Sequence, residues 1–179
     1  RLRLLDADSS VMLLTSLIVG IFSGVGAVLF RNLIDWMQNL AYQDISDMMQ
    51  EYYPLHLILI PAIGGAFVGP LVYYFAREAK GHGVPEVMES LELRGGRIRP
   101  RVVVVKSLAS SICIASGGSV GREGPIAQIG SALGSIVGQV LKLSDDRVRT
   151  LVACGAAGGI AATFNAPIAG AVFALEVLL

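Results

Sequence analysis

Charged residues are scarce in this sequence of 179 residues, and neither sign is in excess. They make up 16% of the chain, whereas soluble domains carry about 25%. Together with a hydrophobic content of 54%, this scarcity excludes a disordered chain and argues against an ordinary soluble enzyme. The 14 basic and 14 acidic residues cancel. We therefore expect no nucleic-acid partner and no long-range field that attracts a charged macromolecule.

Cysteine and histidine are also few. The two cysteines, Cys113 and Cys154, lie among small apolar residues, so they fit a packing role better than a disulfide framework. Neither they nor the two histidines, His56 and His82, have the spacing of metal ligands. The sequence therefore predicts no metal site and no cofactor.

Long apolar segments account for much of the remaining sequence. Residues 11–30 contain no charged side chain, and about 20 such residues span the hydrocarbon core of a bilayer as a helix. We expect this helix to continue to about residue 40, which carries Arg31 and Asp35 into the interface. Two arginines precede the segment, as in a signal peptide. The acidic residues in between, and the length of the segment, favour a retained helix.

Residues 55–76 form the second predicted span, which contains Pro61, Pro70 and three glycines. Such residues break helices in water, but helix bundles in a membrane tolerate them. Four further apolar segments follow, at 102–115, 126–141, 151–162 and 168–179. Short segments interrupted by glycine and proline are typical of broken or re-entrant helices. The sequence therefore predicts an all-α, polytopic membrane protein embedded in the lipid bilayer.

The placement of charge predicts a topology. Five basic residues and no acidic residue lie between Arg94 and Lys106, which favours the cytoplasmic side. The loop after the first span contains Asp44, Asp47 and Glu51 and no base, so we expect it outside. Two crossings then separate the N-terminal arginines from the basic segment and place both on one side. We expect an integral, multi-pass protein of the cell membrane.

Two segments share a pattern that favours anion binding: Gly81-His82-Gly83-Val84-Pro85 and Gly121-Arg122-Glu123-Gly124-Pro125. Each begins with glycine, ends with proline and leads into a helix-like stretch. Proline is favoured in the first turn of a helix, and glycine lets the backbone bend and approach a ligand. The exposed N–H groups of a helix N-terminus attract anions. The alternative is a pair of tight turns between packed helices.

Glu123 strengthens the anion interpretation, because an ionisable residue inside an apolar region is costly and marks a functional site. At a helix N-terminus its carboxylate is stabilised by the N–H groups that would bind an anion, so it can compete with that anion. Protonation would release it, which makes such a gate sensitive to pH. The alternative is a carboxylate that caps the helix or pairs with Arg122.

The segment at 121–125 resembles the signature of the CLC chloride channels and transporters. Gly-His-Gly-Val-Pro at 81–85 resembles the Gly-Ser-Gly-Ile-Pro motif of that family. Phe-Asn-Ala-Pro-Ile-Ala-Gly at 164–170 is similar to a family stretch that follows at comparable spacing. The resemblance covers most of the chain, and the combination of the first and third motifs is specific.

The resemblance implies an all-helical membrane fold of two inverted halves, assembled as a homodimer with one anion path per subunit. It implies that Glu123 is the external gating glutamate. The anion-binding residues that it implies are Gly81, His82, Gly83, Val84, Arg122, Glu123 and Gly124. Because the family's second half supplies another helix end and a tyrosine to the anion site, we expect residues 1–179 to be the N-terminal half of a CLC-type transport domain.

Two residues depart from the family pattern. His82 stands where the family commonly has a serine that touches the central anion, so the preference among chloride, fluoride and nitrate is open; the alternative is a histidine packed at a turn. Val177 stands where proton-coupled members often carry a second glutamate. Valine cannot relay protons, and the neighbouring Glu176 points about 100° away on a helix. Proton coupling is therefore less secure than anion transport.

Lys106 is the remaining charged residue of an apolar segment. It either raises the electrostatic potential of the path or extends to the cytoplasmic surface.

We expect transport of a small anion, with chloride first and protons as a second substrate. One rival is an intramembrane enzyme with Glu123 or His82 as acid or base. An enzyme of this kind would need a nucleophile beside a base, and Ser119 has no His or Lys nearby in sequence. A structural membrane subunit is the other rival.

Overall fold

The computed structural model describes residues 2–44, 56–75 and 81–178, and every regular element in these ranges is helical. The α-helices are α1 (Leu2–Asn39), α3 (His56–Phe75), α4 (Val84–Leu93), α5 (Arg101–Ala115), α6 (Glu123–Val140), α7 (Asp145–Phe164) and α8 (Pro167–Phe173). Two π-helical turns, Leu40–Asp44 and Ala174–Leu178, extend α1 and α8. The predicted all-α class is confirmed.

Within the described residues, α1 and α3 contain the two segments that are long and apolar enough to cross a membrane, Ser9–Tyr42 and Ile58–Phe75. The 38 residues of α1 extend over about 57 Å, more than the ~30 Å of a hydrocarbon core. Both helices expose large apolar side chains, among them Leu13, Leu17 and Phe67. Pro61 and Pro70 lie inside α3 without ending it. The predicted helices at 11–40 and 55–76 are confirmed.

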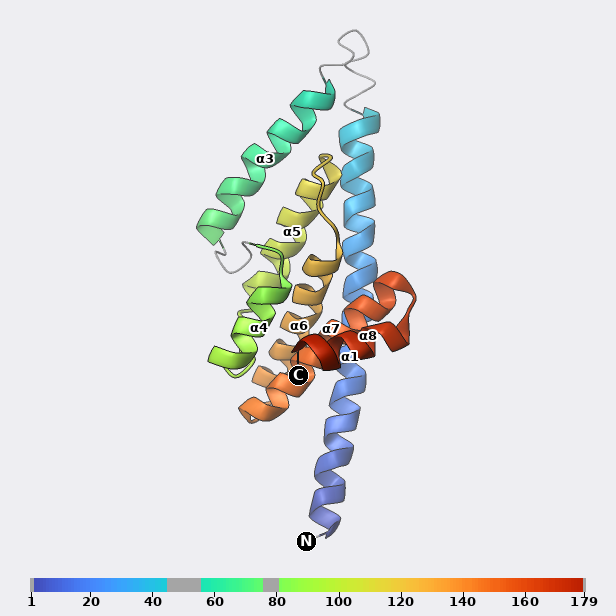
Figure 1. Ribbon diagram of the computed structural model, residues 1–179, viewed down its shortest axis with the longest axis vertical. Helices are drawn as coiled ribbons and strands as arrows, with labels where there is room; N and C mark the ends of the chain where they lie inside the picture. The colour runs from blue at the N-terminus through green and yellow to red at the C-terminus, as the bar shows by residue number, and fades with distance from the viewer. Residues whose placement is uncertain (1, 45–55, 76–80, 179) are drawn as a thin grey trace.

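The chain runs up along α1 and returns through α3 and α4, as Figure 1 shows. The end of α4 therefore lies towards the N-terminal end of α1, and the connection that carries Arg94, Arg97 and Arg99 begins there. This agrees with the prediction that two crossings bring the basic segment back to the side of the N-terminus. Arg1, Asp47 and Glu51, on which the prediction also drew, lie outside the described residues.

The basic connection between α4 and α5 is fastened to α6 and α7. Ser135 Oγ accepts a hydrogen bond from the Ile98 N–H (2.8 Å) and donates one to the Gly96 carbonyl (2.6 Å). Arg97 forms an ion pair of 2.9 Å with Asp145, in the first turn of α7. These contacts hold the end of α4 and the start of α5 against α6 and α7.

Helix α6 lies at the centre, packed on α1, α5 and α7. Eleven residues of this helix are buried, most of them glycine, alanine, serine or isoleucine. Where α6 crosses α7, a Cβ added to Gly155 would collide with the Gly130 carbonyl, and a Cβ added to Gly134 with the Leu151 carbonyl. The two backbones are thus in direct contact, as small residues at a membrane helix crossing allow.

The apolar segments mark the helix interiors better than the helix starts. Helix α6 begins at Glu123, within the motif at 121–125 that predicted a helix start, whereas its apolar segment begins at 126. Helix α7 begins at Asp145, whereas its apolar segment begins at 151. In both cases the first turn carries acidic side chains, which stabilise a helix N-terminus but contribute nothing to an apolar segment. Ser144 is the N-cap of α7 with extended backbone, and its side chain makes no capping hydrogen bond.

Candidate functional site

The start of α6 presents unpaired backbone N–H groups. Glu123 is its first residue and Arg122 its N-cap, and the first helical hydrogen bond runs from the Ile126 N–H to the Arg122 carbonyl (3.1 Å). Among the described residues, the N–H groups of Arg122, Glu123 and Gly124 make no hydrogen bond. Such an end carries a partial positive charge that favours an anion.

The start of α4 is built similarly, but one of its N–H groups is already taken. Gly83, the N-cap, and Gly81 have φ angles of 101° and 105°, values that favour glycine. The Gly83 N–H donates a 2.7 Å hydrogen bond to Oε2 of Glu86. The N–H groups of His82 and Val84 make no hydrogen bond within the described part of the chain.

The two helix starts are in direct backbone contact. A Cβ added to Gly83 would collide with the Gly124 carbonyl, and a Cβ added to Gly124 would collide with the His82 carbonyl. Residues 41 and 42 positions apart therefore meet because both motifs have glycine at the contact. The structure brings together the two motifs that the sequence singled out.

The residues near this contact line two different cavities. Glu123 is exposed and lines a cavity of about 300 Å³ with Arg122 and with Arg31, Asp35 and Gln38 of α1. A second cavity of about 670 Å³ lies between α3 and α5. Gly81, Lys106, Ser110, Cys113 and Val120 are part of its lining. Val120 lines both cavities.

Neither cavity is lined by His82, Gly83, Val84 or Gly124. The two motifs thus share a backbone contact, but His82 and Glu123 do not line a common cavity among the two described above.

Glu123 neither caps α6 nor pairs with Arg122 in the described residues. Its carboxylate folds back over Gly121, where a Cβ would collide with Oε2. The side chain of His82 is exposed. The side chain of Glu123 is exposed as well.

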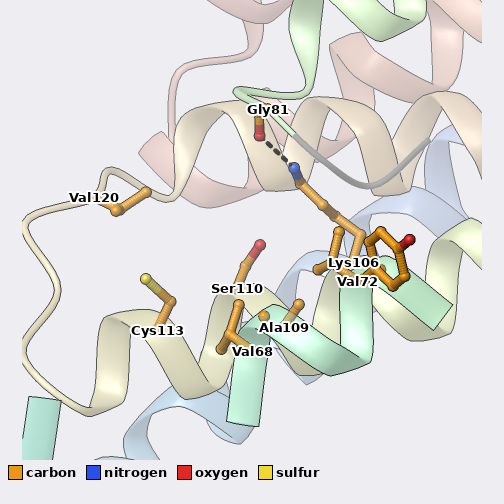
Figure 2. A pocket seen from close by; sticks show the side chains of 10 residues that line it. Val68, Val72, Gly81, Lys106, Ala109, Ser110, Cys113 and Val120 are labelled. Carbon is orange, nitrogen blue, oxygen red and sulfur yellow. Dashed lines mark hydrogen bonds between the residues drawn. The ribbon is translucent and has the colours of Figure 1, made fainter. Parts of the chain in front are cut away.

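Lys106 does not extend to the surface. It is 3% exposed, and its ammonium donates a 2.8 Å hydrogen bond to the Gly81 carbonyl, as Figure 2 shows. The interpretation as a lysine that reaches the cytoplasmic surface is wrong, because the side chain lines the larger cavity and ends on the loop before α4.

Val177 and Glu176 lie in the π-helical turn after α8. Val177 is half-buried against the apolar cluster formed by Val148, Val152 and neighbouring residues, whereas Glu176 is exposed. The carboxylate of Glu176 therefore does not take the place of a carboxylate at position 177.

Glu86 is a residue at this site that the sequence reasoning missed. Its spacing offered a signal, because a glutamate three residues after an N-cap commonly returns its carboxylate to the N-cap N–H.

The third predicted motif, at 164–170, shapes the backbone between two helices. Asn165 ends α7 in the left-handed region with φ 53°, and Pro167 begins α8.

Comparison with known proteins identifies the family of this chain. The family model described as voltage gated chloride channel matches residues 64–179. The H(+)/Cl(-) exchange transporter ClcA of Salmonella paratyphi B is 38% identical over 97% of this chain, and the match covers 38% of that protein. The chain thus spans well under half the length of this relative.

Two solved structures have the same fold. A slow cyanobacterial Cl-/H+ antiporter superposes with a TM-score of 0.79 at 28% identity, over 90% of this chain and 39% of the other. A CLC-type fluoride/proton antiporter gives 0.73 at 26% identity, over 95% and 40%. Fold, motifs and family match together show that this chain belongs to the voltage gated chloride channel (CLC) family.

Proposed function

We propose that this chain supplies part of the path by which a CLC-type transporter moves chloride or a related small anion across the cell membrane. The observation that carries the proposal is the contact between the starts of α4 and α6, each of which has N–H groups without a partner among the described residues. Residues 1–179 correspond in this proposal to the first half of the transport domain, in a protein that functions as a homodimer.

The chemistry follows from the exposed amides. A small anion that leaves water loses strong hydrogen bonds, and fixed N–H dipoles at a helix N-terminus replace them without a full basic charge. The carboxylate of Glu123, on the first residue of α6, competes for the same N–H groups. Protonation weakens its hold, so Glu123 is the gate of the proposed path.

Proton-coupled exchange is a second candidate, because relatives and structural neighbours are named as exchangers or antiporters of chloride or fluoride with protons. Val177 opposes it, since this side chain carries no proton and packs against the apolar cluster. The two candidates differ in one measurable quantity, the number of protons moved for each anion.

The test is reconstitution of the protein at its full native length into liposomes, with anion and proton flux recorded from the same sample. We expect chloride flux that rises at acidic pH and no uphill proton movement. In Glu123→Gln, which cannot ionise, chloride flux should persist and its pH dependence should be lost. Glu92→Gln, an exposed carboxylate at the end of α4, is the matched control and should keep the wild-type pH profile.

Three results separate the candidates. Absence of anion flux in the wild type would refute the proposed function. A normal pH profile in Glu123→Gln would reject Glu123 as the gate. Stoichiometric proton movement against its gradient would establish exchange in place of passive transport.

His82→Ser should shift anion selectivity. An imidazole and a hydroxyl present different donors beside the exposed loop before α4. One hydrogen bond to a charged group changes a permeability ratio by about tenfold. Liposome flux with chloride, nitrate and fluoride measures the ratios, and unchanged ratios would show that His82 does not face the anion.

A further inference from the structure

We propose that Lys106 and Glu86 form a clamp that orients residues 81–83 towards the anion, and that both are positioning residues for transport. The proposal rests on the proposed function, because it concerns the loop at the start of α4. It assigns to Lys106 a geometric role distinct from raising the potential of the path.

The first arm of the clamp is Lys106. Its side chain lines the cavity between α3 and α5, and its ammonium lies 2.8 Å from the Gly81 carbonyl (Figure 2). Burying a lysine to 3% exposure is costly unless its charge has partners. The carbonyl is one partner, and the charge of Glu86 also acts on Lys106. The side chain therefore has a fixed end point on the loop.

The second arm is Glu86, in the first turn of α4. Oε2 accepts the Gly83 N–H at 2.7 Å, and a Cβ added to Gly81 would collide with Oε1. The carboxylate thus lies against both glycines of the loop. It also lies at the positive end of the helix dipole, which stabilises it there.

Together the two arms hold the residues on either side of His82. Gly81 and Gly83 both have φ near 100°, and glycine reaches many other conformations at little cost. Fixing the Gly81 carbonyl and the Gly83 N–H therefore sets the direction of the His82 N–H between them. This N–H has no partner among the described residues.

The charges distinguish a clamp from an electrostatic effect. Lys106 and Glu86 carry opposite charges, so the pair adds no net charge to the path. If these residues acted by potential alone, loss of the cation would weaken anion binding and loss of the carboxylate would strengthen it. If they act as a clamp, loss of either one weakens binding.

The experiment uses Lys106→Met, Glu86→Ala and the double variant in the protein at its full native length. Chloride affinity is measured by calorimetry in detergent, and the chloride dependence of flux in liposomes. We expect each single variant to weaken chloride affinity by about tenfold. The double variant should be no weaker than the poorer single one, since the two residues act as a unit.

Glu86→Gln adds a rescue arm, because its amide oxygen still accepts the Gly83 N–H without a charge. The clamp requires near wild-type affinity in this variant, whereas an effect of charge gives the same result as alanine. Glu92→Ala and Lys142→Met, both exposed, are the matched controls. If Lys106→Met yields no folded protein, Glu86→Ala and Glu86→Gln decide the question alone.

The outcomes are distinct. No chloride binding in the wild type would refute the proposed function and the clamp with it. Wild-type binding with unchanged affinity in Glu86→Ala would refute the clamp and leave the proposed function intact. Tighter binding in Glu86→Ala would replace the clamp by an electrostatic effect.

Discussion

Replacing Gly124 by alanine should reduce anion flux by at least about tenfold while the protein still enters the membrane. The added Cβ would collide with the His82 carbonyl. That atom belongs to backbone held by Gly81 and Gly83, so no flexible side chain can move aside. The starts of α4 and α6 must then separate, and the contact between them is lost. The measurement is chloride flux in liposomes, normalised to the amount of reconstituted protein.

Gly65→Ala is the matched control, since a Cβ at this position of α3 meets no atom within 4 Å. Flux in this variant should equal that of the wild type. Gly83→Ala should behave like Gly124→Ala, because its Cβ would collide with the Gly124 carbonyl and its φ of 101° strains any residue with a side chain. Normal flux in Gly124→Ala would show that the contact between the two helix starts is dispensable.

The membrane spans were the most predictable part of this fold. Burial in lipid demands a continuous apolar segment, and such a segment lies within α1 and along the whole of α3. The apolar segments alone do not locate the starts of α6 and α7. Their first turns contain Glu123 and Asp145, which interact with the helix dipole and not with lipid, so an apolar criterion omits them.

The site was predictable where it depends on backbone chemistry. Glycine and proline at 81–85 and 121–125 predicted two helix starts, and the structure places these two starts in contact. The partner of Lys106 was not predictable, because the Gly81 carbonyl lies 25 residues away and the hydrogen bond depends on how α5 packs. Gly81 and Glu123 line different cavities, and this too depends on how the helices pack.

Replacing Gly155 by leucine should prevent correct folding, the largest effect on stability that we expect in this chain. The first side-chain atom would already collide with the Gly130 carbonyl of α6, and it would lie 3.3 Å from the Gly134 nitrogen. The remaining atoms of leucine have no space at a crossing where two backbones touch. Overpacking of a core costs about 1–3 kcal/mol, and the rigidity of two backbones places this substitution at or above that range. The measurement is the yield of monodisperse protein in detergent and its thermal unfolding.

Gly65→Leu is the control for this substitution, because position 65 is exposed on α3 and a Cβ added there has no atom within 4 Å. It should fold with wild-type yield and midpoint. Gly155→Ala separates the steric effect from side-chain size, since it adds only the atom that collides, and it should fall between the wild type and leucine. Normal yield and unfolding of Gly155→Leu would mean that α6 and α7 can move apart, and with them the start of α6 and Glu123. The position of Glu123 therefore depends on the close approach of α6 and α7 at Gly130 and Gly155.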